Sequence, residues 1–169
     1  MKKLLLVGAM AFFGAVNAQT TGGFKLGAHV GLPVGDIADY TSLNAGVDLA
    51  YTWKVAPSLD LGITTGYSHY FGKDYTYNFM GTSYTIEAEG TGIIPIAATA
   101  QYGFTGGFFI GADLGYAIFT QEGSDGGFLY QPKIGYSFKE KNDLYLAYKG
   151  ISVDGGTVSS INLGYAYKF

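Results

Sequence analysis

The last ten residues of the chain alternate strictly between two kinds of side chain. Apolar or aromatic residues occupy every second position, at Ile161, Leu163, Tyr165, Tyr167 and Phe169, and the residues between them are small or polar. A period of two is typical of a β-strand, because successive side chains of a strand point to opposite faces. The pattern therefore predicts a strand with one apolar and one polar face that runs to the final residue.

Seven more segments show the same alternation, and turn-forming residues separate them. The predicted strands cover residues 24–32, 44–54, 59–68, 93–102, 108–118, 128–138, 144–149 and 160–169. In the fourth strand we expect Ile94, Ile96 and Tyr102 on the apolar face, and Ile93 and Gln101 on the opposite face. An even number of strands joined in sequence is what a closed up-and-down barrel requires.

The charged residues indicate which face of these strands meets water. The apolar face carries no charge within the strands, whereas the opposite face holds a predicted lumen polar network of Lys25, His29, Asp48, Asp60, Asp113, Lys133, Lys149 and Lys168. A soluble barrel would show the reverse. A lysine at mid-depth on a lipid-facing surface costs about 2 to 4 kcal/mol, while charges in a lumen are tolerated when they pair. The chain is thus predicted to be all-β, a closed eight-stranded antiparallel transmembrane β-barrel.

The predicted connections differ in length and charge. Those after the second, fourth and sixth strands are short, and this rim carries Lys54, Lys139 and Lys141 against Glu140 and Asp143. The other four are expected to be long, and they carry Asp36, Asp39, Asp74, Glu87, Glu89, Glu122, Asp125 and Asp154 with Lys73. Solvated loop acids are the simpler interpretation of this acidic rim. Binding of divalent cations together with lipopolysaccharide phosphates is the alternative.

Composition supports this class of protein. The chain has 169 residues, with 15 Tyr, 12 Phe and 14% charged residues, which is too aromatic and too weakly charged for an ordinary soluble surface. Cysteine is absent, which excludes disulfides and thiolate metal sites. All ten basic residues are Lys and the net charge is −3, so we expect no nucleic-acid partner.

The first 18 residues have the pattern of a cleavable signal peptide. Lys2 and Lys3 precede an apolar core from Leu4 to Val16, and a small residue, Ala18, ends the segment at a suitable cleavage site. Two domains are therefore expected, a signal peptide at 1–18 and a barrel domain at 19–169.

In strand pattern and length, residues 19–169 resemble the small eight-stranded outer-membrane β-barrels of the OmpX and OmpA-transmembrane type. The resemblance implies location in the outer membrane of a Gram-negative bacterium, with both termini in the periplasm and the long loops outside. It also implies contact with outer-membrane lipid and lipopolysaccharide. The alternating residues of the C-terminal strand, 161–169, resemble the signal that the barrel insertion machinery reads in this family.

Prolines and glycines inside the strands are departures from that pattern. Pro95 and Pro132 each remove a backbone donor, so a bulge is expected at each. Glycines are frequent on the inner face and are expected to leave the lumen less filled; they are Gly27, Gly31, Gly46, Gly62, Gly66, Gly111, Gly115, Gly135 and Gly164. A narrow porin-like channel for ions or small solutes is therefore an alternative function, although eight strands usually enclose only side chains.

The two histidines are the residues to consider for chemistry. His29 is expected to be a hydrogen-bonding residue of the lumen. Some small barrels that modify lipid A place His and Ser near the external rim, where Ser68 and His69 are expected. Adjacent strand residues point to opposite faces, however, and neither has an evident acidic partner on its own face. We therefore assign no catalytic residue, cofactor or metal site, and a lipid A-modifying enzyme remains a third hypothesis.

The third and fourth strands continue beyond what a membrane crossing needs. Their apolar phase extends into a surface-interaction candidate set of Tyr75, Tyr77, Phe79, Tyr84 and Ile86. The two alternating segments span 21 and 19 residues, against the roughly 9 to 11 that cross a bilayer. An external hairpin over residues 72–91 with one aromatic face is predicted, and adhesion or envelope structure through it is the first functional hypothesis. Alternatively, these aromatics pack on neighbouring loops or lipopolysaccharide sugars.

Overall fold

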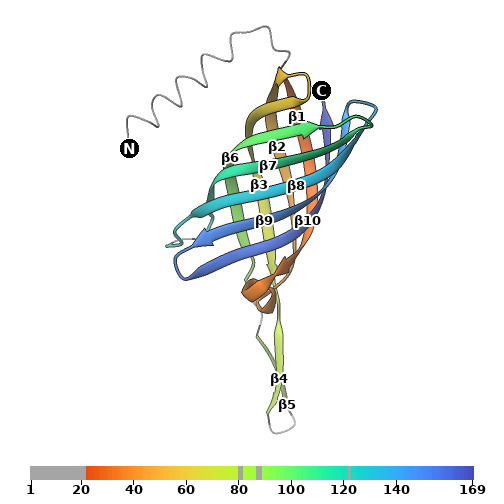
Figure 1. The fold of residues 1–169 in the computed structure, drawn as a ribbon. Helices are drawn as coiled ribbons and strands as arrows, with labels where there is room; N and C mark the ends of the chain where they lie inside the picture. Colours follow the sequence, from red (N-terminus) through yellow and green to blue (C-terminus); the bar gives the residue numbers. More distant parts are fainter. Residues whose placement is uncertain (1–21, 80–81, 87–88, 122) are drawn as a thin grey trace, which may run out of the picture.

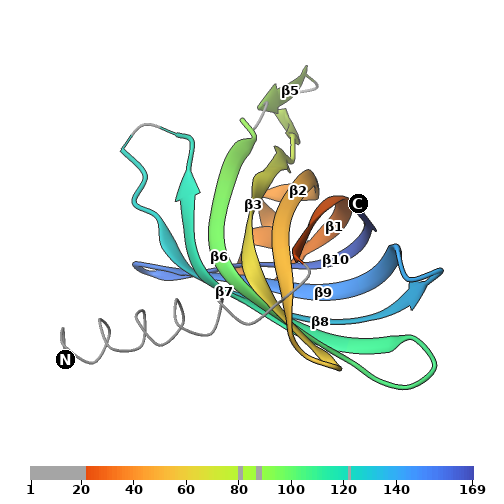
Figure 2. The ribbon, with the colours of Figure 1, turned by 90° about the horizontal axis from the view of Figure 1, so that it is seen from above.

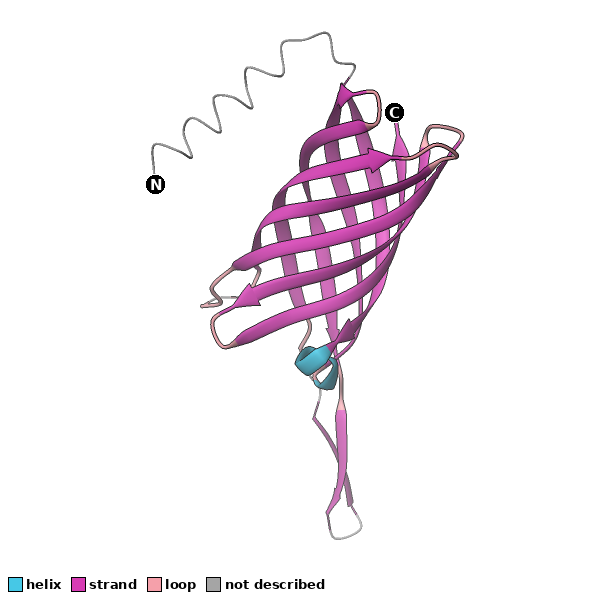
Figure 3. Ribbon diagram, in the orientation of Figure 1, coloured by secondary structure: helices cyan, strands magenta, loops and turns pink. Residues whose placement is uncertain are grey.

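β-strands make up almost all of the described chain (Figure 1). The computed structural model describes residues 22–79, 82–86, 89–121 and 123–169, so the predicted signal peptide lies outside the described residues. The strands are β1 (Gly22–Val34), β2 (Thr41–Ala56), β3 (Leu59–Gly72), β4 (Tyr75–Phe79), β5 (Thr82–Ile86), β6 (Thr91–Gly103), β7 (Phe108–Phe119), β8 (Gly127–Phe138), β9 (Asn142–Val153) and β10 (Gly156–Lys168). A short 3-10 helix, η1 (Gly35–Asp39), follows β1 (Figure 3). No helix in the described part of the chain is long and apolar enough to cross a membrane.

Eight of these strands close into one antiparallel barrel. Their order around the ring is β1-β10-β9-β8-β7-β6-β3-β2, and all eight pairings are antiparallel. The first and last strands close the ring through ten residue pairs, from Lys25↔Lys168 to Val34↔Ser159. Figure 2 shows the strands following one another around a central axis. The predicted fold class, a closed eight-stranded up-and-down barrel, is confirmed.

The barrel has two unlike ends. β1 begins at Gly22 and β10 ends at Lys168, so both chain termini of the barrel lie at one end, which we call the terminal end (Figure 1). The connections there cover only residues 57–58, 104–107 and 139–141. The opposite end, which we call the hairpin end, carries β4 and β5 as a separate two-stranded sheet.

Large apolar side chains cover the outside of the barrel. In β10, Ile161 and Leu163 are 51% and 49% exposed, while Asn162 between them is buried. β6 has the predicted phase, because Ile96 is exposed and Ile93 is buried. A continuous apolar surface of this kind is stable against lipid hydrocarbon and unfavourable in water. The exterior therefore has the character of a membrane-spanning barrel.

Exposed charges in the described chain are confined to connections and strand ends. They are Asp36, Asp39, Lys54, Lys73, Asp74, Glu89, Asp125, Lys139, Glu140, Lys141 and Asp154. The apolar belt between the two ends carries no charge among the described residues, as the sequence predicts. At the terminal end this belt finishes in aromatic pairs such as Tyr102 and Phe104, whose ring centroids are 5.1 Å apart. Aromatic rings at such a boundary are typical of a membrane interface.

The prediction of a bulge at each strand proline is wrong. The pairing of β3 with β6 is interrupted at Pro95, but Thr65↔Ile96 and Ser68↔Ile93 on either side keep one register. The pairing of β8 with β9 is likewise interrupted at Pro132 without a shift. Each proline remains paired with β7 on its other side, at Ala117 and Ala112. The missing backbone donor therefore interrupts the pairing only locally, because β7 holds the proline-containing strand in register from its other side.

The connection between β9 and β10 also differs from the prediction. It is a turn at Asp154 and Gly155, not a long loop, because β9 continues to Val153 and β10 begins at Gly156. Gly155 has a φ of 91°, in the left-handed region that glycine adopts without strain. The tight turn lets the last two strands pair to their ends, through Gly156↔Val153.

The third strand does not run unbroken into the external hairpin. β3 ends at Gly72 and β4 begins at Tyr75, so the predicted long strand is two strands in two sheets. The hairpin itself is present, since β4 and β5 pair from Tyr75↔Ile86 to Phe79↔Thr82. It extends away from the barrel at the hairpin end (Figure 1).

A charge placed on the apolar belt tests this orientation. Leu114, in the middle of β7, is 53% exposed. Leu114→Lys is expected to lower the free energy of unfolding by about 2 to 4 kcal/mol. Ser124→Lys adds the same charge to the exposed connection between β7 and β8, and is expected to change it by less than about 0.5 kcal/mol. Urea titrations in phospholipid vesicles measure both, and equal effects would contradict a lipid-facing Leu114.

Candidate functional site

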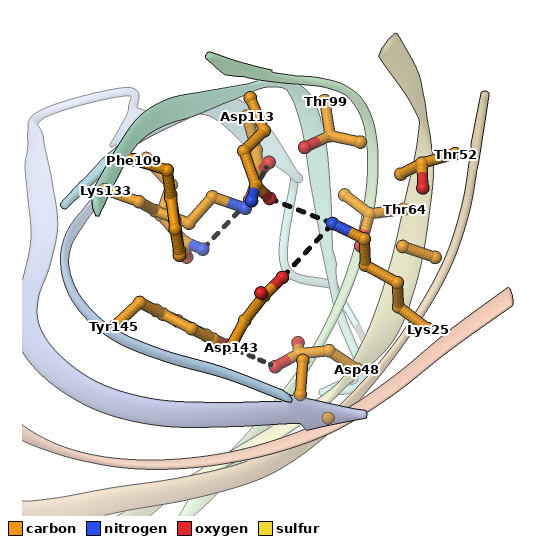
Figure 4. A pocket seen from close by; sticks show the side chains of 15 residues that line it. Lys25, Asp48, Thr52, Thr64, Thr99, Phe109, Asp113, Lys133, Asp143 and Tyr145 are labelled. Atoms are coloured by element: carbon orange, nitrogen blue, oxygen red, sulfur yellow. Dashed lines mark hydrogen bonds and ion pairs between the residues drawn. The ribbon is translucent and has the colours of Figure 1, made fainter. Parts of the chain in front are cut away.

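Inward-facing polar residues form a network that fills much of the lumen. Each barrel strand contributes alternate residues, because every second side chain of a strand points inward. The structure places all of the predicted network residues on the inner face, and it brings most of them into direct contact. Figure 4 shows the charged residues that line one cavity of the lumen.

Asp143 is the centre of the cluster nearest the terminal end. Its two carboxylate oxygens lie 3.3 Å from the ammonium groups of Lys25 and Lys168. Ser137 donates a hydrogen bond to the same carboxylate, and Lys25 also donates to the side-chain oxygen of Gln101 at 2.9 Å. The sequence prediction assigned Asp143 to the short-turn rim, which is wrong, since this side chain is only 2% exposed. β9 begins at Asn142, two residues before the predicted start at 144, so Asp143 is a strand residue and its side chain points inward.

Asp113 and Lys133 form the second ion pair, on β7 and β8. The ammonium group of Lys133 lies 2.7 Å from a carboxylate oxygen of Asp113, and Gln131 donates to the other oxygen at 3.0 Å. Lys133 also lies over the ring of Tyr145, 5.7 Å from its centroid. Asp60 pairs instead with Lys54, which is largely exposed at the terminal end. The lumen carboxylates are thus paired in separate contacts, and those of Asp113 and Asp143 line the same cavity.

His29 connects four polar side chains in the middle of the lumen. Its Nδ1 lies 2.6 Å from Asp48, and its Nε2 lies 3.0 Å from the hydroxyl of Ser68. Lys149 donates to the same hydroxyl at 2.9 Å. In a consistent assignment Lys149 donates to Ser68, Ser68 donates to a neutral His29, and Nδ1–H donates to Asp48. Tyr145 donates to Asp48 from the other side, at 3.3 Å.

This arrangement brings a serine, a histidine and an aspartate into the order found in hydrolytic triads. Ser68 is nevertheless fully buried, and His29 is only 5% exposed. A substrate carbonyl therefore has no path to the hydroxyl, and the contacts serve to satisfy buried polar groups.

The sequence analysis considered Ser68 with His69 and did not find the contact with His29. His69 lies on the outer side of β3, where its ring contacts Phe71 at 4.7 Å between centroids. His29 reaches Ser68 across β2, because Gly46 pairs with both residues and has no side chain. A Cβ at Gly46 would lie 2.6 Å from the His29 ring. The glycine between the two positions was the one available signal.

Inner-face glycines make room for large side chains from adjacent strands, so the prediction of a less filled lumen is wrong. The Tyr145 ring covers Gly164, and the Phe109 ring covers Gly135, so a Cβ at either glycine would collide with a ring. Aromatic rings that cover glycines in this way stabilise curved sheets. The cavity left within the charged cluster is about 60 Å³, space for a few water molecules.

An apolar cluster closes the lumen towards the hairpin end. We call it the apolar plug; it consists of Tyr70, Ile93, Ala97, Ala117, Leu129 and Ile151, all buried. Between the plug and the His29 contacts, the hydroxyls of Tyr70 and Ser160 lie 2.9 Å apart. The lumen is thus polar from the terminal end to its middle and apolar beyond.

The remaining predicted sites lie outside the lumen. For the surface-interaction candidates the structure describes only the backbone; the register pairs Tyr77 with Tyr84 and Tyr75 with Ile86, which puts these positions on one face of the ladder. The C-terminal residues 161–169 have their alternate side chains on the exposed outer face of β10 and just beyond it. Within the described residues, no group of three or more potential ligands could hold a metal ion.

The fold is shared with solved β-barrels, although no family model and no curated protein matches the chain. A designed transmembrane β-barrel has 14% identity and a TM-score of 0.54, covering 89% of this chain and 98% of that one. Neisserial surface protein A has 18% identity and a TM-score of 0.52, and the match covers 90% of this chain and 100% of that one. A third match is Ail, the attachment invasion locus protein of Yersinia pestis, in complex with the heparin analogue sucrose octasulfate. It has 11% identity and a TM-score of 0.51, and the match covers 90% of this chain and 100% of that one.

The chain therefore has the fold of the small eight-stranded outer-membrane β-barrels. A designed barrel matches it as well as the natural ones do. The likeness at this level of identity is one of fold, and function has to be argued from the residues of this chain.

Removing one carboxylate from the lumen tests the pairing. Asp143→Asn keeps the shape of the side chain but leaves Lys25 and Lys168 without their shared partner. We expect the free energy of unfolding to fall by about 3 to 5 kcal/mol, as for other broken buried pairs. Asp60→Asn makes the same chemical change in the more exposed pair with Lys54, and we expect a loss of at most about 1 kcal/mol. Urea titrations that give similar losses for both variants would count against a buried network at Asp143.

Proposed function

We propose that the protein is a non-enzymatic integral outer-membrane barrel that acts in surface interaction, adhesion-like in kind, or in envelope structure. The observation that carries this proposal is the two-stranded sheet of β4 and β5, which extends beyond the hairpin end (Figure 1). The hairpin is longer than a connection between two barrel strands requires, because two residues are enough between β9 and β10.

The backbone of the hairpin favours contact with another molecule. β4 and β5 pair only with each other among the described residues, so each strand has an outer edge with backbone donors and acceptors. Such an edge can accept a further strand, and an isolated two-stranded hairpin is marginally stable in water. The register also places five apolar or aromatic positions, those of the predicted surface-interaction set, on one face. A partner that covers this face would stabilise the hairpin.

The proposal includes an orientation in the membrane. We infer that the terminal end, with its short turns, faces the periplasm and that the hairpin end faces outward, the usual arrangement for such barrels. Outer-membrane lipid would then surround the apolar belt, with lipopolysaccharide near the hairpin end. The aromatic outer face of β10 is the segment we propose for recognition by the barrel insertion machinery.

The partner is expected to differ from the polyanion bound to Ail. The described connections at the hairpin end carry Asp36, Asp39, Asp74, Glu89, Asp125 and Asp154 against one cation, Lys73. A rim of this charge repels sulfated ligands. We therefore favour a surface without strong negative charge, such as a neutral or cationic protein surface, as the target of the hairpin.

The two alternative functions have less support. A channel would need a continuous water path, whereas the apolar plug and the His29 contacts fill the lumen in the described chain. A lipid A-modifying enzyme would need an accessible nucleophile, whereas Ser68 is fully buried and His69 lies on the opposite face of β3. Neither alternative is proposed further.

Deleting the hairpin tests the proposed function. The variant lacks residues 76–85, and binding of the folded barrel in lipid nanodiscs is measured to immobilised collagen, fibronectin and laminin. We expect the intact protein to bind at least one of these surfaces. The deletion is expected to weaken that binding at least about tenfold, because the free edges and the aromatic face are removed.

A loop variant provides the control. Replacing residues 36–39 of η1 by Gly and Ser alters another connection at the same end, and this change is expected to leave binding unchanged. Heat-modifiable gel mobility confirms that each barrel is folded. Undiminished binding after the deletion, or no binding of the intact protein to any of the three surfaces, would count against the proposal.

A further inference from the structure

A large open cavity lies at the hairpin end, between the apolar plug and the solvent. We call it the vestibule; its volume is about 550 Å³, within the range of roughly 300 to 1,000 Å³ typical of small-molecule sites. All four connections at this end contribute to its wall, including Tyr40, Glu89, Asp125 and Asp154. The barrel strands supply its floor. The cavity is therefore built by the closed fold and does not depend on the conformation of a single loop.

The floor of the vestibule is apolar. Ile93 and Tyr70 are members of the plug, and Phe119, Val153 and Val158 pack against it. These five side chains come from β3, β6, β7, β9 and β10, so they are held by the sheet. A ligand with an apolar body would gain about 25 cal/mol for each Å² of apolar surface that it buries here.

The wall of the vestibule is negatively charged. Glu89, Asp125 and Asp154 line it, and none of them forms an ion pair with another described residue. The described lining contains no Lys and no His. The vestibule differs in this respect from the lumen on the other side of the plug, where most carboxylates have a cationic partner. The ring of Tyr40, which is 63% exposed, lines the same cavity and can also contact a cation.

We propose that the vestibule is a binding site for small amphiphilic monoamines, molecules with one ammonium group attached to an aromatic or alkyl body. The apolar body lies on Phe119, Val153 and Val158, and the ammonium group lies among the three carboxylates. Anions are excluded by charge. Neutral analogues gain the apolar contact but lose the ionic one, so the site discriminates by charge as well as by shape.

Binding of matched indole compounds tests this assignment. The probe is tryptamine, with neutral tryptophol and anionic indole-3-propionate as comparators of similar size. The full barrel is studied in zwitterionic nanodiscs, and empty nanodiscs correct for partition into lipid. We expect saturable binding of one tryptamine per barrel, weaker binding of tryptophol and none of indole-3-propionate. Amide resonances of Ser124 and Gly155 should shift on titration, whereas that of Gly106 at the terminal end should not.

Charge-neutral variants locate the cation. The triple variant Glu89→Gln, Asp125→Asn, Asp154→Asn is expected to weaken tryptamine binding at least about threefold, since each exposed carboxylate contributes roughly 1.5- to 5-fold. Asp125→Asn alone is compared with Asp36→Asn, which removes the same charge from a residue of η1 that does not line the vestibule and should leave binding unchanged. The amide spectrum shows that each variant is folded.

Three results would overturn the proposal. The first is an absence of saturable tryptamine binding to the folded barrel, which would mean that the acids are only solvated. The second is equal binding of the three indoles, which would mean an apolar cavity without charge selection. The third is an equal loss of binding in the Asp36→Asn and Asp125→Asn variants, which would mean a general surface charge effect.

Discussion

The structure depends on one electrostatic constraint, that charges inside a narrow barrel surrounded by hydrocarbon have to be neutralised by other groups within the lumen. Lys25, Lys133, Lys149 and Lys168 meet this constraint through contacts that lead to Asp48, Asp113 and Asp143, while Asp60 pairs with Lys54 at the terminal end. Asp143 serves two lysines at once, while Lys149 is held by a serine and a histidine that lead to Asp48. With the hydrogen bond from Lys25 to Gln101 on β6 and the Asp113–Lys133 pair of β7 and β8, these contacts tie every barrel strand to another, in addition to the backbone ladder.

The same constraint explains the small residues of the inner face and the closure of the lumen. A glycine on one strand lets a long side chain on its neighbour reach across, as His29 does over Gly46 and Tyr145 over Gly164. Glycine here provides space for rings and ion pairs, and the barrel is consequently filled. With the interior used for stability, the surfaces left for interaction with other molecules are the hairpin and the vestibule at the same end.

Much of this fold follows from the sequence, because the period of two and the apolar or polar character of each strand face are local properties. The barrel, the phase of its strands, the inward charges and the external hairpin were all predictable on that basis. Strand ends were less predictable, since Asp143 and the turn at Asp154 depend on how far two strands pair. The contact between His29 and Ser68 joins strands that are not neighbours, and Pro132 keeps its register through a second neighbour. Both depend on the closed ring, which no single segment encodes.

Single-channel conductance in a planar bilayer tests the central claim, that the network and the apolar plug close the barrel. The protein is inserted after heat-modifiable gel mobility has confirmed folding. A closed lumen predicts that the folded barrel produces no steady openings above the background of the bilayer. Reproducible openings of one size would contradict this account, because ions would then have to cross both the paired charges around Asp143 and the apolar layer at Ile93.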